Sequence, residues 1–373
     1  MEELLEQLKK EWLQLKEEIE KTISIKVDYE PIEYILSENE VLITEALNPQ
    51  LPQLAPFVVF ELSCRLGRVS NLLIAPRASG KTKTAIISSK ILPAERLDFP
   101  TPKSLQEKLN GKKKVDLFLE DMTNLVQTQV LPMIATLIFQ HEYDAGDIKI
   151  PYTDFCFFSG CQYEKIEQII NLPEWTQMLQ DRMLRLYIFY YHRPQVNNPL
   201  KEDEFPEIPY VEITPRDPNL PIEVDEKRIL DLASMLETQI SPDRTINYTK
   251  SILSGHAILC NRDTVTEEDA NWLQLYEPCI TIEQHLYRRT PSKILARMSF
   301  ETAQYGILFF YLKDENPDLK RISRILRFPE KTAESILKSI LTNLECQLIK
   351  NQIVGVWIEK LKNLHNVYSL EPI

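Results

Sequence analysis

Residues 71–82, with the sequence NLLIAPRASGKT, decide the fold of this chain of 373 residues. The apolar run 71–75 is typical of a buried strand, and the residues from Thr82 to about Ile91 predict a helix. Between them, APRASGKT fits the pattern G-x-x-x-x-G-K-[ST] at every fixed position except the first, where Ala75 stands in place of glycine. The predicted strand, loop and helix follow one another in the order that this phosphate-binding pattern requires. The alternative is that the match arose by chance in a surface loop.

The residue types in this loop suit the phosphates of a nucleotide. Gly80 lets the backbone approach them without a Cβ in the way, and N–H groups of the loop and the next helical turn point at their oxygens. The Lys81 ammonium adds a charge, and the Thr82 hydroxyl can bind Mg²⁺. We predict that ATP or GTP is bound by nine residues: Ala75, Pro76, Arg77, Ala78, Ser79, Gly80, Lys81, Thr82 and Lys83.

Three further apolar runs predict the other strands of a parallel sheet. They are VDLFL at 115–119, DFCFF at 154–158 and LYIFYY at 186–191. Short apolar runs separated by helical segments are typical of buried parallel strands in an α/β layer. Few glycines and many prolines, eight against 24, also favour an α-rich protein over Gly-rich β architectures.

Two acids follow the run 115–119, in the manner of a Walker B strand. Glu120 and Asp121 would lie at the carboxyl edge of the sheet, where the phosphate loop also lies. We assign Glu120 to Mg²⁺, through water, and Asp121 to the attacking water. The usual order is Asp then Glu, so the inverted pair leaves room for slow hydrolysis. Two exposed acids without a role are the alternative.

Charge is unevenly distributed along the chain. The net charge of −12 argues against DNA binding by the whole surface, because phosphate contacts supply most of that affinity. Residues 291–373, however, hold 12 Lys and Arg against 9 Asp and Glu, whereas the rest holds 31 against 46. The C-terminal part is therefore the part expected to contact a polyanion.

The six cysteines form no C-x-x-C pair and have no histidine at zinc-finger spacing. They are interpreted as reduced thiols of a cytoplasmic protein. The charged N-terminus is unlike a signal peptide, and no apolar run is long enough for a membrane span. We expect no membrane contact.

Two segments differ from the core in composition. Residues 2–23 lack Gly and Pro and place apolar residues on one stripe of a helix: Leu5, Leu8, Trp12, Leu15 and Ile19. This helix packs on its own domain or docks a partner as a short coiled coil. Residues 194–224 hold seven prolines and many acids, which predicts an extended linker.

The stretch from Asn71 to Tyr191 resembles the core of AAA+ ATPases. In that family a small polar residue at the position of Ser159 senses the γ-phosphate, and an Arg before the last core strand reaches into the neighbour's ATP site. Arg185 matches that position best, and Arg182 is the alternative; surface ion pairs are the other possibility for both. The resemblance implies ATP and Mg²⁺ as ligands, and a homo-oligomer or an assembly with other AAA+ subunits.

The segment 248–275, YTKSILSGHAILCNRDTVTEEDANWLQL, resembles the lid of the MCM branch, among the MCM and Orc-like replication ATPases. The matching residues are Gly255, His256, Ala257, Arg262, Asp263, Val265, Thr266, Asp269 and Ala270. Thr266 and Asp269 fit a helix-capping box, so this part signals fold rather than catalysis. The lid Arg of the family would fall near Ser251; Lys250 is the nearest substitute.

The C-terminal part predicts a winged helix. Helical stretches at 301–313, 318–326 and 330–344 precede β-like runs at 346–350 and 355–358. Basic residues lie on or near the second and third helices, from which DNA contacts are ordinary: Arg321, Arg324, Arg327, Lys331 and Lys338. The alternative is that the winged helix binds a protein instead of DNA.

Together these features predict an α/β protein with a three-layer AAA+ P-loop core and a parallel sheet. The expected divisions are an N-terminal helix and linker (1–38), the ATPase core (39–194), a linker (195–224), a helical lid (225–288) and a winged helix (289–373). The expected function is ATP binding and hydrolysis on DNA, in replication initiation, helicase loading or mobile-element maintenance. The alternatives are a nucleotide-gated scaffold with little turnover and a STAND-like signalling or defence ATPase.

Overall fold

The computed structural model describes residues 27–97, 100–125, 129–170, 172–173, 175–192, 205–286, 300–349 and 351–369. The helix expected at 2–23 lies outside these residues. Within the described part of the chain, none of the helices combines the length and the apolar character that crossing a bilayer requires.

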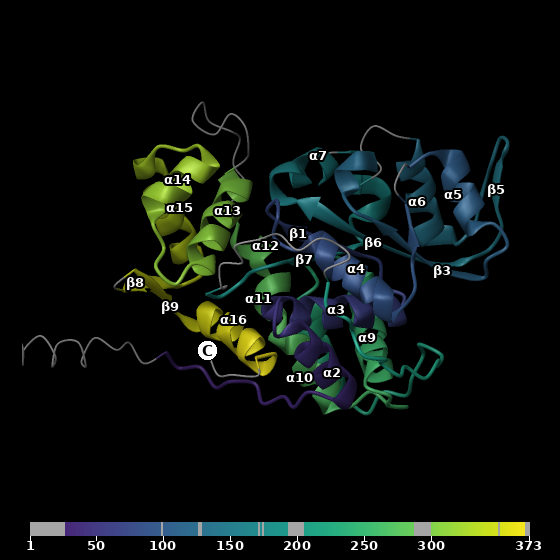
Figure 1. The fold of residues 1–373 in the computed structure, drawn as a ribbon, viewed down its shortest axis with the longest axis horizontal. Helices are drawn as coiled ribbons and strands as arrows, with labels where there is room; N and C mark the ends of the chain where they lie inside the picture. The colour runs from purple at the N-terminus through teal and green to yellow at the C-terminus, as the bar shows by residue number, and fades with distance from the viewer. Residues whose placement is uncertain are drawn as a thin grey trace, which may run out of the picture.

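A five-stranded parallel sheet lies at the centre, in the strand order β2-β3-β6-β1-β7 (Figure 1). Its strands are β1 (Asn71–Ala75), β2 (Glu95–Arg96), β3 (Lys114–Leu119), β6 (Asp154–Gln162) and β7 (Leu184–Tyr187). All five residues of β1 are buried, as expected of a parallel strand covered on both faces. The four predicted strands are confirmed, although β6 continues past residue 158 to 162 and β7 covers 184–187 instead of 186–191.

Helices lie on both sides of the sheet, with α3 and α4 on one side and α6 and α7 on the other (Figure 1). The helices of this part are α2 (Glu38–Leu47), α3 (Ala55–Leu66), α4 (Lys81–Ile91), α5 (Pro102–Leu109), α6 (Val130–Gln140) and α7 (Ile166–Ile170). Short turns occupy Pro52–Leu54, Met122–Leu125, Tyr163–Lys165 and Trp175–Leu179, and a hairpin joins β4 (Tyr143–Ala145) to β5 (Ile148–Ile150). The helix predicted after the loop is thus confirmed as α4.

A group of helices after the linker packs against α3. They are α8 (Glu226–Ser234), α9 (Pro242–Leu259), α10 (Glu267–Leu275), α11 (Glu277–Ile280) and α12 (Ile282–His285). The capping box of Thr266 and Asp269 at the start of α10 is confirmed. The described residues 205–224 form no helix and only an isolated β-bridge, at Ile222, and Phe205 and Val211 are buried, so this segment is held against the protein.

The chain ends in a second helical group, which we call the C-terminal unit. It contains α13 (Phe300–Lys313), α14 (Leu319–Leu326), α15 (Glu330–Asn343), the hairpin β8 (Gln347–Ile349) and β9 (Gln352–Val354), and α16 (Val356–Val367). The second predicted β-run, 355–358, is wrong: Gly355 precedes the first turn of α16. This helix returns to the core, where His365 Nε2 lies 3.0 Å from the Phe189 carbonyl oxygen.

The approach of α3 to α9 depends on two glycines. A Cβ on Gly255 would lie 1.9 Å from the Ser63 carbonyl oxygen, and one on Gly67 would lie 2.0 Å from the Ser251 carbonyl oxygen. Both obstacles are backbone atoms, so a rotamer change cannot relieve the clash. The helices after the linker are therefore fixed to α3 at backbone contact.

We predict that Gly255→Ala destabilises the protein by about 1–3 kcal/mol, because the added methyl group forces the two backbones apart. In an exposed helix the same change would stabilise by roughly 1 kcal/mol. The matched control is Asn247→Ala on the exposed face of α9. Denaturant unfolding of both variants measures the difference; a Gly255→Ala variant as stable as the control would contradict the close approach.

Candidate functional site

The loop between β1 and α4 has the backbone shape of an anion-binding nest. Ala78 and Gly80 have left-handed conformations, with φ of 59° and 104°. Left-handed residues among right-handed ones turn successive N–H groups into one concavity, which fits a phosphate oxygen. Gly80 immediately precedes α4, and no described side chain caps the first turn of that helix. The N–H groups of the first turn are thus available to an anion.

Lys81 lies along this loop. Its Nζ donates to the carbonyl oxygens of Ala75 at 2.8 Å and Pro76 at 2.7 Å. Burial lowers the pKa of Lys81 to about 8, against the opposing effect of Cys161, Asp121 and other acids nearby. The ammonium is therefore desolvated and positioned at the loop. Ala75 itself is the last residue of β1 and has no positive φ, so this position accepts a Cβ.

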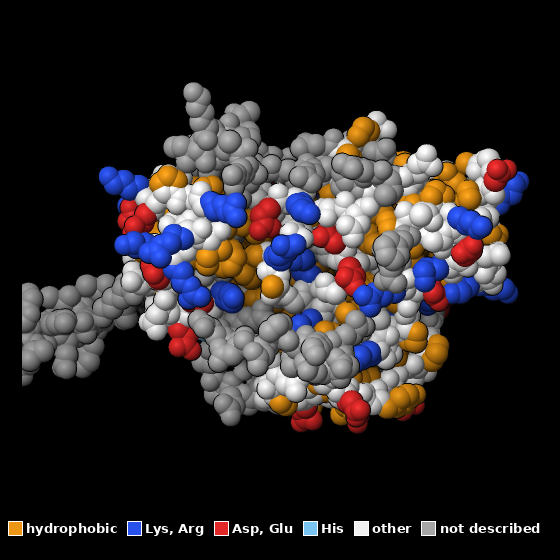
Figure 2. Space-filling view, turned by 45° about the horizontal axis from the view of Figure 1, so that its top comes forward, with side chains coloured by type: hydrophobic (Ala, Val, Ile, Leu, Met, Phe, Trp, Pro, Cys, Tyr) orange, Lys and Arg blue, Asp and Glu red, His pale blue; other side chains and the backbone are white. Residues whose placement is uncertain are grey.

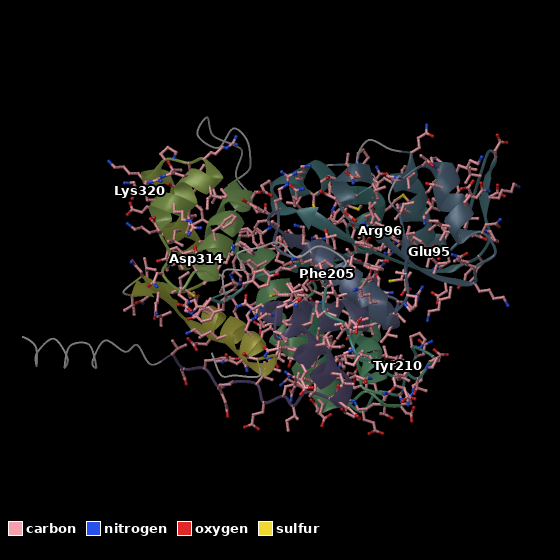
Figure 3. The ribbon with its side chains drawn as sticks, viewed as in Figure 1. Glu95, Arg96, Phe205, Tyr210, Asp314 and Lys320 are labelled. Atoms are coloured by element: carbon pink, nitrogen blue, oxygen red, sulfur yellow. The ribbon has the colours of Figure 1, made fainter. Side chains whose placement is uncertain are left out.

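The other predicted loop residues differ in exposure. Pro76 and Ser79 are buried, Arg77 and Ala78 are exposed, and Thr82 and Lys83 are half-buried. The Tyr190 hydroxyl donates to the Ser79 carbonyl oxygen, and the Lys83 Nζ lies 5.6 Å from the centre of the Phe205 ring. In Figure 3 Phe205 lies over α4, so the linker covers this side of the helix.

The strand register places Gln162, rather than Ser159, at the carboxyl edge of the sheet. Ala75, the last residue of β1, is aligned with Gln162, whereas Ser159 is aligned with Leu72 of β1 and Leu119 of β3. Ser159 is buried, and its Oγ donates to the Leu119 carbonyl oxygen at 2.7 Å. Gln162 was missed because the run DFCFF ends four residues before it.

Asp121 and Glu120 have different partners. The Asp121 Oδ2 accepts a hydrogen bond from Gln162 Nε2 at 3.0 Å, and its Oδ1 accepts one from Thr123 Oγ1 at 2.6 Å. Glu120 pairs with Arg96 of β2, at the sheet edge labelled in Figure 3. Asp121 therefore faces Lys81 and Gln162, while the Glu120 side chain is held on the side of β2.

One further acid lies near the loop. Glu164 follows β6 in the turn Tyr163–Lys165 and interacts electrostatically with Lys81 and Arg77. Burial raises the pKa of Glu164. No sequence pattern pointed to Glu164. The predicted strand ended at residue 158 rather than at Gln162, so Glu164 was not expected to lie close to the end of a strand.

The two candidate arginines are both held within the chain. Arg185 forms a two-pronged pair with Glu283 of α12, at 2.7 and 2.8 Å, and only 4% of its side chain is exposed. Arg182 has 12% of its side chain exposed and lies over the Phe139 ring at 4.2 Å. Contact with a neighbouring subunit requires an exposed guanidinium, and both side chains are largely covered in this conformation.

Oxygen donors suited to Mg²⁺ lie at the same edge. The Thr82 hydroxyl is half-buried in the first turn of α4, and the Asp121 carboxylate is half-buried after β3. Hydroxyl and carboxylate oxygens are ligands that Mg²⁺ prefers, together with phosphate oxygens and water. The donor set and the phosphate-sized nest thus fit a nucleotide with its metal ion.

Comparisons with known proteins give distant structural neighbours. No family model matches the chain, and neither does any curated protein sequence. The SCCmec type IV Cch active helicase gives a TM-score of 0.38 at 11% identity, over 84% of this chain and 67% of that one. Two point mutants of Thermotoga maritima RuvB each give a TM-score of 0.26, at 10% and 9% identity, over 86% and 80% of this chain and 93% and 88% of theirs. The parallel sheet with its nest after β1 agrees, by its own geometry, with a P-loop nucleotide-binding core.

Proposed function

We propose that the chain binds ATP at residues 75–83 and hydrolyses it as an AAA+ ATPase. The observation that carries this proposal is the nest at the uncapped start of α4, with the desolvated Lys81 ammonium beside it. A cation and N–H groups that the protein already holds in place favour a polyanion, because their attraction to phosphate is stronger in partly buried surroundings than in water.

The roles at the carboxyl edge follow from the contacts. Asp121 is the acid for the attacking water, and Gln162 takes the place predicted for Ser159 because it contacts Asp121 directly. Thr82 would hold Mg²⁺, which would neutralise charge developing on the phosphates. Glu120 would have to turn away from Arg96 to reach that ion.

An oligomer would use Arg182 rather than Arg185 in the neighbour's site. Separating Arg185 from Glu283 would leave buried charges unpaired, which costs roughly 3–5 kcal/mol. Arg182 gives up a half-buried acid, Asp181, a hydrogen bond to the Met178 carbonyl oxygen and a contact with the exposed ring of Phe139. The guanidinium of Arg182 is therefore the one that can be redirected at lower cost.

The C-terminal unit would be the DNA-binding part, as a winged helix with α15 as the recognition helix and β8–β9 as the wing. Lys and Arg side chains gather at the left of Figure 2, over this unit. We call the exposed basic residues of α14, α15 and the turn between them the basic face: Lys320, Arg321, Arg324, Arg327, Lys331 and Lys338. Within the described part of the chain, no ion pair engages any of them. Unpaired cations on one face suit the phosphates of DNA.

For ATP, we predict that Lys81→Ala lowers the affinity at least tenfold, and that Asp121→Asn leaves binding intact but lowers kcat by about 10²–10⁴. Binding is measured with a fluorescent ATP analogue and turnover by phosphate release. Glu120→Gln is the matched comparison, because it also replaces a carboxylate by an amide, at the residue next to Asp121. Equal turnover in the wild type and in both acid variants would contradict the catalytic proposal. If that turnover were also negligible while ATP still bound, the result would indicate a nucleotide-gated scaffold.

The lowered pKa of Lys81 predicts a pH dependence. In the free protein Lys81 loses its proton as pH rises through about 8, whereas bound phosphates keep it charged. Affinity for ATP should therefore fall about tenfold between pH 7 and pH 9. The unfolded chain keeps this proton up to a higher pH, so the free protein should gain stability over the same window.

The matched control for this dependence is Lys81→Arg. Its guanidinium stays charged throughout, so the fall in affinity should be absent while the titration of the nucleotide itself remains. Identical pH profiles for the wild type and Lys81→Arg would show that Lys81 does not titrate in this range.

For DNA, we predict that Arg324→Glu with Lys331→Glu weakens binding about tenfold at low salt and flattens its salt dependence by about one unit of slope per lost phosphate contact. The control reverses the same charge at exposed lysines of the core, Lys103→Glu with Lys113→Glu. Fluorescence anisotropy with labelled duplex gives both numbers. Equal affinity in the two double variants would remove the basic face from the DNA site.

A further inference from the structure

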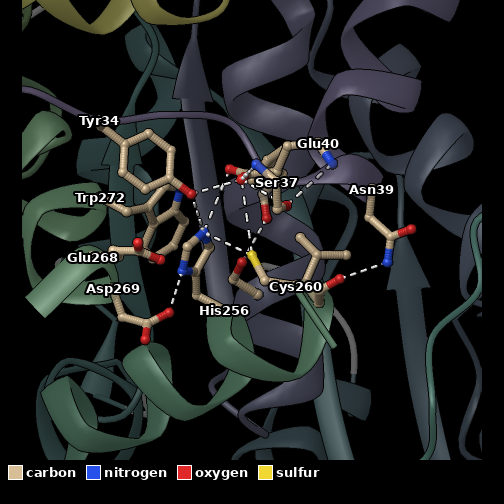
Figure 4. A network of polar contacts seen from close by, with 12 residues as sticks. Tyr34, Ser37, Asn39, Glu40, His256, Cys260, Glu268, Asp269 and Trp272 are labelled. Carbon is tan, nitrogen blue, oxygen red and sulfur yellow. Dashed lines mark hydrogen bonds and ion pairs between the residues drawn. The ribbon is translucent and has the colours of Figure 1, made fainter. Parts of the chain in front are cut away.

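A histidine, a cysteine and a glutamate meet away from the phosphate loop (Figure 4). His256 and Cys260 lie four residues apart at the end of α9, so both project from one face of the helix. Glu40 comes from α2, across the interface between the two helices. No C-x-x-C pair accompanies this His-x-x-x-Cys pair, and Glu40 lies 216 residues before His256, so the sequence did not reveal the cluster.

The spacing of the three donor atoms suits one metal ion. The His256 Nε2 lies 3.5 Å from Cys260 Sγ and 3.4 Å from Glu40 Oε1, and Cys260 Sγ lies 3.8 Å from Glu40 Oε2. Zinc bonds of about 2.0–2.3 Å in a tetrahedron separate neighbouring ligand atoms by about 3.3–3.6 Å. The three donor groups, whose ligand atoms lie within 4.8 Å of one another, are thus close to the spacing that surrounds a zinc ion.

The surroundings orient the imidazole as they do in metal sites. The Nδ1 of His256 lies 2.6 Å from Asp269 Oδ1, and the ring stacks on Trp272 with centroids 3.9 Å apart. Asp269 is itself fixed, since it accepts a hydrogen bond from Arg262 Nη2 at 2.6 Å. A carboxylate behind a ligand histidine sets its tautomer and turns Nε2 to the metal.

The charge of the three donor groups and their access to solvent also suit a divalent metal ion. Glu40 and His256 are fully buried, whereas Cys260 and Tyr34 are half-buried and form the open side of the cluster. The Tyr34 hydroxyl lies 3.0 Å from His256 Nε2 and 2.6 Å from Glu40 Oε2, beside the fourth position of a tetrahedron. A carboxylate and a thiolate together neutralise a divalent cation, so the bound ion would leave no net charge in the interior.

We propose that Glu40, His256 and Cys260 bind a zinc ion that joins α2 to α9. Imidazole, thiolate and carboxylate form a borderline-soft set that favours Zn²⁺ over Mg²⁺ or Ca²⁺. The ion joins the segment before the core to the helices after the linker, and it takes no part at the phosphate loop.

The test is the zinc content of the full chain, measured by mass spectrometry after desalting. The wild type should retain about one zinc per chain, and Cys260→Ser and His256→Gln should retain almost none. The control is Cys346→Ser, which alters a thiol of the C-terminal unit that has no part in the cluster. Equal zinc in Cys260→Ser and Cys346→Ser would overturn the proposal.

A second measurement decides the matter if the variants do not fold. The chelated wild type should lose about 3–6 °C of Tm and regain it with zinc but not with magnesium. Added Co²⁺ should produce thiolate-to-cobalt charge-transfer absorption, which reports directly on a Cys–metal bond. A chelated chain with unchanged Tm and no such absorption would show that the cluster is a hydrogen-bonded network without metal.

Discussion

The hydrogen-bond register of β6 between β1 and β3 is the constraint on which the phosphate site depends. It aligns Gln162 with Ala75 and brings the ends of three strands to one edge. A shift by one residue would turn every side chain of β6 to the other face of the sheet and take Gln162 away from Asp121. Because β6 is buried on both faces, no alternation of polar and apolar residues fixes that register.

A buried ionic network near the opposite ends of the strands fixes the register of β6 instead. Asp116 of β3 accepts a hydrogen bond from Arg65 Nε at 3.0 Å and pairs with Arg68, whose Nε donates to Asp154 of β6 at 2.9 Å. Arg65 is fully buried, so a slipped strand would leave its charge unpaired in the interior. Asp116, the first acid of VDLFLED, is therefore a structural residue, and it sets the position of the two acids that come after it.

Sequence patterns found most of the fold because strands and helices are local. The run 71–75 coincides with β1, and the end of β6 was misplaced because 159–162 is partly polar and yet buried. The contacts of the site residues, by contrast, depend on partners that are far away in the sequence. Arg185 is buried by Glu283, 98 residues away, and Glu40 meets His256 across 216 residues. No spacing rule in one sequence reveals such pairs, so the arginine was placed at the surface and the cluster of Glu40, His256 and Cys260 was missed.

Tyrosines connect the C-terminal unit to the region of the phosphate loop. Tyr305 of α13 lies within hydrogen-bonding distance of the carbonyl oxygens of Ile74, at 3.1 Å, and Ile188, at 2.8 Å. Tyr190 donates to the carbonyl of Ser79 and meets the Phe309 ring edge-on at 5.8 Å. A loop that moves to enclose phosphates must carry Tyr190 with it or break that bond, and either result changes the packing of α13. Nucleotide state would thus reach the basic face through a short series of side-chain contacts.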